Sequence, residues 1–165
     1  MKKSKLVLVI FAAALLGLVG CDNKEGCTDN NANNYDSEAD KNSGCVFRYS
    51  STIDISGVST NNPNGDAWDI DGTGPDLRMN FGKSTSSGYD FSTDLQYDVS
   101  AVTLTPTSSI QFTNEEWKYQ LIDDDLLSSA ETIATGTFNP VTQGGSNVIS
   151  ITNGNVIIKF NYTVH

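Results

Sequence analysis

Histidine is nearly missing from this 165-residue sequence, which has a single copy, His165, as its last residue. A Ser-His or Cys-His catalytic pair needs an imidazole beside the nucleophile, and many zinc sites use histidine ligands. One terminal histidine cannot build either arrangement. A pair of carboxylates could still cleave a glycosidic bond, but the sequence does not single out two acidic residues at the required separation. We therefore expect a binding protein and not an enzyme.

Basic residues are also scarce, with 10 Lys and Arg against 20 Asp and Glu. Three of the ten, Lys2, Lys3 and Lys5, stand at the very start, so the remaining chain carries 7 − 20 = −13 charges. This balance excludes nucleic acid as a partner, because phosphate binding needs clustered Lys and Arg. It also gives no attraction to anionic lipid unless a cation intervenes.

Long apolar runs are absent except for one, which extends from Leu6 to Val19 directly after the three lysines. The run is too short to cross a hydrocarbon core of about 30 Å comfortably. A basic start, a short apolar run and small residues before a cysteine are typical of an export signal. We expect residues 1–20 to be a signal peptide that is removed.

The end of this signal, Leu18-Val19-Gly20-Cys21, resembles the lipobox of bacterial lipoproteins. The resemblance implies that Cys21 becomes the first residue and carries diacylglycerol and an amide-linked chain such as palmitate, which together anchor a protein stably. The alternative is an ordinary secretory signal that leaves Cys21 as a spare thiol. We expect an anchor in the cell envelope. We favour the outer membrane or cell surface, because Lys24-Glu25 resembles a surface-export signal, although Asp22 would favour the inner membrane under enterobacterial sorting.

Cysteine is rare too, and with Cys21 acylated only Cys27 and Cys45 remain, for one disulfide. The residues between them are almost all polar, and closing this loop would stabilise the fold by about 3 kcal/mol in the chain-entropy model. The segment from Gly26 to Cys45 resembles a short cysteine-bounded repeat of secreted and surface proteins of some Gram-negative bacteria, where it is a spacer. Solvated charges are favoured over a cation site for its acidic residues, which are Asp29, Asp36, Glu38 and Asp40.

From Val46 onward the sequence lacks apolar residues at helical spacing and shows short alternating stretches separated by turn-forming residues. The clearest is Val156 to Val164, whose alternate residues share one face, and Asn153-Gly154 before it is a hairpin turn signal. We expect an all-β domain over 47–165, an antiparallel β-sandwich of seven or eight strands, with a small barrel as the competitor. The other predicted strands are Thr52 to Val58, Leu77 to Phe81, Val99 to Thr105, Glu116 to Ile122, Thr132 to Phe138 and Val148 to Thr152.

Two acidic stretches interrupt the strand pattern, Asp66 to Asp76 and Asp123-Asp124-Asp125. Like charges on loops repel one another unless they are screened, and Ca²⁺ prefers carboxylates on flexible, Gly-rich loops. An EF-hand is excluded because the twelfth loop position counted from Asp69 is Asn80 and not Glu. We expect one Ca²⁺ shared by the two loops. The alternative is that these residues only cap turns.

Both stretches resemble the C2 domain, a calcium-dependent β-sandwich. Gly72-Thr73-Gly74-Pro75-Asp76-Leu77 is similar to the family's Gly-x-Ser-Asp-Pro-Tyr signature, and Trp117 to Ile133 is similar to its strand, Asp-x-Asp loop and later Asp-x-Ile. The sequence departs from the family where Pro75 precedes Asp76 and where Ala130 replaces an acidic residue. The ligands that the resemblance implies are Asp76, Asp123 and Asp125, with Glu131 at the last acidic position and Asp69 or Asp71 as the first loop's other carboxylate.

Three apolar residues, Trp68, Leu126 and Leu127, lie in or beside these loops. In C2 domains such residues can enter a bilayer once calcium is bound, but we favour their plugging the open end of the sandwich. We expect a lipoprotein that uses its calcium-binding end for adhesion or for contacting lipid or protein. The alternatives are a carbohydrate-binding module that stacks sugars on Trp68, Trp117 or tyrosines, and a structural subunit of an envelope assembly.

Overall fold

The computed structural model describes residues 23–69, 71–125, 129–145 and 147–165. These residues form eleven strands and no helix, which confirms the all-β class. None of them forms a helical stretch with the length and hydrophobicity needed to span a bilayer. The predicted signal peptide and Cys21 lie outside the described residues.

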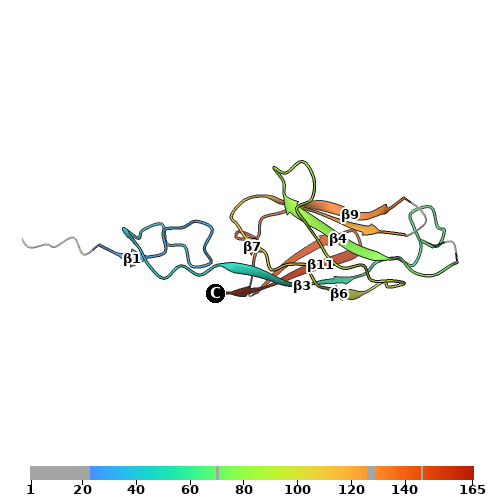
Figure 1. The fold of residues 1–165 in the computed structure, drawn as a ribbon, viewed down its shortest axis with the longest axis horizontal. Coiled ribbons are helices and arrows are strands. Elements are labelled where there is room, and N and C mark those ends of the chain that lie inside the picture. Colours follow the sequence, from blue (N-terminus) through green and yellow to red (C-terminus); the bar gives the residue numbers. More distant parts are fainter. Residues whose placement is uncertain (1–22, 70, 126–128, 146) are drawn as a thin grey trace, which may run out of the picture.

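Two antiparallel sheets face each other as a sandwich, as predicted, and share one core (Figure 1). The first sheet has the order β10-β11-β3-β6, with β7 pairing to the start of β3, and the second has the order β5-β4-β8-β9. The bounds are β3 Arg48–Ser56, β4 Leu77–Lys83, β5 Phe91–Ser92, β6 Val102–Leu104, β7 Gln111–Phe112, β8 Trp117–Asp123, β9 Glu131–Phe138, β10 Val148–Asn153 and β11 Val156–Val164.

The core is built from the inward-facing residues of the strands and is rich in aromatic rings. In β11 four of the five residues predicted to share a face are buried and the last, Val164, is partly buried, whereas Ile157 between them is 37% exposed. The ring of Phe160 in this strand stacks on Phe138 of the opposite sheet at 4.7 Å and meets Phe81 edge-on at 5.6 Å. These ring contacts hold the two sheets together.

Strand β3 begins at Arg48, four residues before the predicted start at Thr52. A β-bulge explains the difference, because residues 51–52 lie opposite the single residue Asn161 of β11. The extra residue reverses the phase of the inward and outward alternation within the strand. A sequence pattern with a period of two therefore detects only the part of β3 that follows the bulge.

The turn between β10 and β11 is Gly154-Asn155, one residue later than predicted, because Asn153 pairs with Val156. Gly154 has a φ of 60°, in the left-handed region that the first position of such a turn requires.

The segment before the sandwich is closed by the predicted disulfide between Cys27 and Cys45. Its two short strands, β1 Glu25–Gly26 and β2 Lys41–Asn42, pair in parallel. The ammonium of Lys24 lies 2.9 Å from a carboxylate oxygen of Asp36 and 2.9 Å from one of Glu38. Since the ammonium of Lys24 already pairs with both carboxylates, the arrangement favours solvated ion pairs over a cation site.

Replacing Phe160 by Ala is expected to lower the free energy of unfolding by about 3–5 kcal/mol, because the ring is fully buried between the sheets. Ile157→Ala on the outer face of the same strand is the matched control and should change it by less than about 0.5 kcal/mol. Urea denaturation with the disulfide intact measures both. Equal losses for the two variants would contradict the described orientation of β11.

Candidate metal centre

The alternation of β8 places a carboxylate inside the end of the sandwich. Trp117, Tyr119 and Leu121 face the core, and Asp123, the next residue in the same phase, is only 1% exposed. The strand period therefore carries a charged side chain into the space that apolar residues fill elsewhere.

Hydrogen bonds join this carboxylate to the loop before β4. The backbone N–H of Asp76 donates to Oδ1 of Asp123 at 2.7 Å, and the N–H of Asp124 donates to the carbonyl of Asp76 at 2.9 Å. The N–H of Asp98, in the loop after β5, donates to Oδ1 of Asp76 at 3.0 Å. Three loops that are distant in sequence thus meet at one end of the molecule.

The carboxylates of these loops form two groups that share Asp69. In each group, one oxygen from every member lies within 4.8 Å of one oxygen from every other member. Calcium binds oxygen at about 2.3–2.6 Å, so oxygens on opposite sides of one ion lie about 4.6–5.2 Å apart. The spacing therefore suits a shared divalent ion. The groups are Asp69, Asp123 and Asp125, and Asp69, Asp76 and Asp98.

Asp98 was not predicted from the sequence. It follows Tyr97 in a loop with no acidic run, and only the fold brings it to Asp76. Its φ of 56° is unusual for a residue other than Gly and marks a tight local turn. That conformation is not visible in the sequence.

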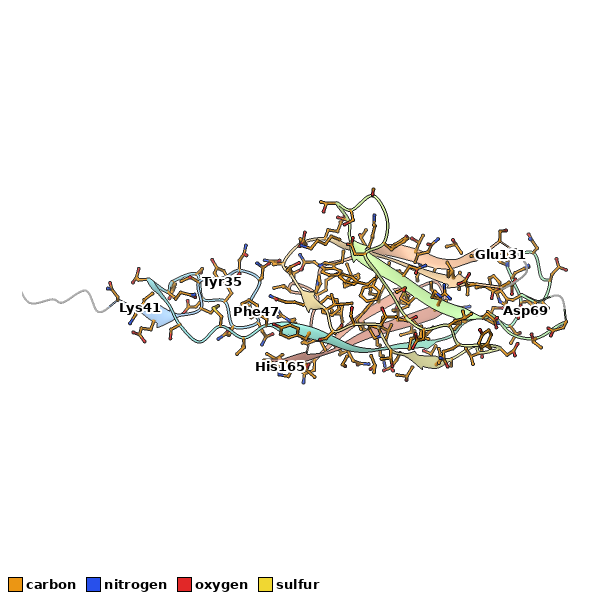
Figure 2. The ribbon with its side chains drawn as sticks, viewed as in Figure 1. Tyr35, Lys41, Phe47, Asp69, Glu131 and His165 are labelled. Atoms are coloured by element: carbon orange, nitrogen blue, oxygen red, sulfur yellow. A yellow bond between two sulfur atoms is a disulfide. The ribbon has the colours of Figure 1, made fainter. Side chains whose placement is uncertain are left out.

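Two other predicted ligands lie outside these groups. Asp71 is exposed and accepts hydrogen bonds from the hydroxyl of Thr73 at 2.7 Å and from its backbone N–H at 3.1 Å, so it caps a turn. Glu131 is exposed and pairs with Asp123 across β8 and β9. Figure 2 shows Glu131 at the same end of the sandwich as Asp69. Asp71 and Glu131 thus lie outside the two carboxylate groups.

One buried oxygen in the cluster lacks a partner. Oδ2 of Asp123 is inaccessible to solvent and accepts no hydrogen bond from the described residues. Burying a carboxylate oxygen without a donor or a cation is unfavourable by several kcal/mol, in order-of-magnitude terms. A cation in contact with this oxygen would satisfy it.

The acidic residues also raise one another's pKa. A hydrogen bond with Asp125, followed by burial, raises the pKa of Asp69 to about 7. Burial first, and then the charges of Asp125 and Asp76, raise the pKa of Asp123 to about 6. Two carboxyl groups share a hydrogen bond only when one of them is protonated. The cluster therefore holds a proton near neutral pH when no cation is bound.

The apolar residue Trp68 is packed at this end of the molecule. It is 9% exposed, and its indole N–H donates to the carbonyl of Ser59 at 2.8 Å. Trp117 is 1% exposed, so neither tryptophan offers a free face for stacking on a sugar. The other predicted tip residues, Leu126 and Leu127, lie outside the described residues.

The sequence matches no protein-family model and no curated protein. Similar solved structures exist. Human GIVD cytosolic phospholipase A2 in complex with methyl gamma-linolenyl fluorophosphonate is 12% identical with a TM-score of 0.53, over 74% of this chain and 17% of that chain. BON1-C2B is 10% identical with a TM-score of 0.50, over 73% of this chain and 92% of that chain. This chain thus spans less than a fifth of the phospholipase and most of the C2 structure, and its fold is C2-like.

The stability of the cation-free protein is expected to fall as the pH rises from about 4 to about 7. Asp69 and Asp123 have folded-state pKa values above the ordinary 3.8, so the folded state binds more protons than the unfolded state between those values. The stability from this protonation is complete at low pH and is lost as the pH rises through about 6 and about 7. Urea denaturation in the presence of a chelator measures the slope.

Asp123→Asn should flatten this pH dependence, because the amide keeps the oxygen that accepts from Asp76 and removes the charge. Asp94→Asn changes the charge equally at an exposed position outside both groups and is the control. Identical slopes for the two variants would show that the cluster does not titrate in this range.

Proposed function

We propose that this protein is a lipid-anchored protein of the bacterial cell envelope whose C2-like module binds Ca²⁺ through the acidic cluster and uses that end for adhesion or for contacting lipid or protein. The observation that carries the calcium site is the buried Oδ2 of Asp123, which has no partner among the described residues and belongs to a group of converging carboxylates. A divalent cation is the chemical group that this arrangement fits.

Calcium suits the donor set better than other common divalent ions. The donors are carboxylate oxygens on loops, with no sulfur and no imidazole among them, which disfavours zinc. Magnesium requires a near-ideal octahedron and retains several waters, whereas calcium accepts six to eight oxygens in a flexible arrangement. An extracellular module of this kind is expected to bind calcium with a Kd of about 10⁻⁴ to 10⁻³ M.

A bound calcium would offset two of the negative charges of the cluster and displace its proton. Asp69, Asp123 and Asp125 would hold the ion, with Asp76 and Asp98 available on the other side of Asp69. The hydrogen bond with Asp125 and burial raise the pKa of Asp69, burial raises that of Asp123, and neighbouring charges add to both; an ion at this position would attract the charged form of each carboxylate instead. An anionic ligand could approach this end only after that change, because the chain from Cys21 onward is strongly acidic.

The anchoring part of the proposal is supported by the sequence. Leu18-Val19-Gly20-Cys21 lies in the position of a lipobox, after a basic start and an apolar run. The disulfide between Cys27 and Cys45 suits an exported protein, because such bonds persist in oxidising compartments.

In cells fed a clickable palmitate analogue, the full-length protein is expected to incorporate the label, and Cys21→Ser is expected to lose it, because Cys21 is the acylated residue. In-gel fluorescence with an immunoblot for total protein measures the ratio. Label retained by the Cys21→Ser variant would show that acylation occurs elsewhere. Protease treatment of whole cells would then separate surface-exposed from inward-facing protein.

Calorimetric titration with CaCl₂ is expected to show binding by the lipid-free protein from Asp22 onward and a loss of at least tenfold in affinity for Asp123→Asn/Asp125→Asn, because two of three converging charges are removed. Asp94→Asn is the matched control and should bind as the unaltered protein does. Asp71→Asn should have a smaller effect than the double variant. Absence of binding by the unaltered protein would reject the calcium site.

A further inference from the structure

The acidic cluster and the disulfide-closed segment lie at opposite ends of an elongated molecule. Figure 2 shows Tyr35 and Lys41 of this segment at one end and Asp69 and Glu131 at the other. Strand β1, two residues after the first described residue, Asn23, lies at the end that carries the disulfide (Figure 1). The predicted anchoring residue, Cys21, precedes Asn23 by two positions in the sequence.

The disulfide-closed segment passes into the sandwich without a free linker. The backbones of Phe47 and His165 exchange two hydrogen bonds of 2.6 and 3.0 Å, so the chain is held in the β3 and β11 ladder directly after Val46. A contact that is distant in sequence also joins the segment to the sandwich, because the backbone N–H of Asn114 donates to Oδ1 of Asn31 at 2.9 Å. This direct connection and the second contact together resist bending at the junction better than a flexible linker would.

We infer that the segment from Lys24 to Val46 is a rigid stalk that holds the acidic end away from the membrane carrying the anchor. The ligand of the acidic end would then lie on a surface other than that membrane. The inference rests on the proposed anchor and calcium site, and it gives the disulfide-closed segment a role. The acidic end would then contact a second surface and not the bilayer in which the protein is anchored.

The length of the sandwich alone keeps the cluster clear of the anchoring bilayer when the molecule stands upright. The nine residues of β3 span about 30 Å along the long axis. The headgroup layer of each leaflet is only about 5–8 Å thick. The cluster at the far end therefore lies well outside this layer.

Little on the described surface would hold the molecule flat on the bilayer. Its exposed large apolar side chains are few and come from four separate segments of the sequence, at Tyr35, Tyr89, Tyr97 and Ile157. The chain from Cys21 onward has a net charge of −13, which an anionic membrane surface repels.

The two tryptophans provide a test that needs no label on the protein, because they lie at different levels along its long axis. Trp68 lies in the loop of the acidic end, whereas Trp117 contacts Phe112, which pairs with Arg48 at the stalk end of β3. The lipidated full-length protein is reconstituted into phosphatidylcholine vesicles containing a dansyl lipid as energy-transfer acceptor. The Trp117→Phe variant keeps only Trp68, the donor far from the membrane of an upright molecule. The Trp68→Phe variant keeps only Trp117, the donor nearer to the membrane.

Upright molecules should lose more donor emission to the dansyl lipid from Trp117 than from Trp68, with and without CaCl₂. A flexible Gly/Ser insertion between Val46 and Phe47 should reduce this difference, because the stalk no longer sets the angle of the sandwich. Equal transfer from both donors in the uninserted protein would overturn the inference, as would a calcium-dependent rise for Trp68. The calcium-free measurement keeps its meaning if calorimetry detects no calcium binding, so the two proposals fail separately.

Discussion

The acidic end of the molecule depends on one interaction, the hydrogen bond from the backbone N–H of Asp76 to the buried carboxylate of Asp123. It links two loops whose residues are 47 positions apart in the sequence. On the Asp123 side of this bond, Asp125 follows two residues later and joins the cluster. On the Asp76 side, the backbone N–H of Asp98 donates to the carboxylate of Asp76 and brings Asp98 to the cluster. The carboxylate thus serves as a structural acceptor with one oxygen, and the other oxygen remains available for a cation.

The alternation of apolar residues predicted the long strands well, since burial of one sheet face leaves a direct signal of period two. It failed where pairing changes phase, as in β3 at the bulge opposite Asn161. It also failed for β1, β2, β5 and β7, because two residues are too few to show a period. The convergence of the two acidic loops agrees with the prediction, because β4 begins at Leu77, β8 ends at Asp123, and these two residues pair in the antiparallel ladder. The place of Asp98 was not, because it depends on a loop conformation with a positive φ.

The acidic charges of this chain occur in two physically different settings that composition alone could not separate. In the disulfide-closed segment, Lys24 and Lys41 form ion pairs with neighbouring carboxylates on an exposed surface, where such pairs add little to stability. At the other end, Arg78 pairs with Asp124 at 2.7 Å. The converging carboxylates beside that pair instead share a hydrogen bond and burial, and their pKa values rise. In the disulfide-closed segment, lysines therefore pair with three of the acidic side chains on the surface. In the cluster, a proton or a cation reduces the repulsion between the buried carboxylates.

Competition between a proton and a cation also explains why weak calcium binding is expected from such a dense cluster. With a pKa of about 7, Asp69 keeps part of its proton near neutral pH and must release it to hold the ion, which reduces the apparent affinity. The aromatic core, with Phe160 stacked on Phe138, lies away from the charges and can stabilise the fold while the loops repel one another. The cluster can therefore remain assembled without calcium and change its charge when calcium arrives. With the proposed stalk, the less negative acidic end would point away from the membrane of the proposed anchor.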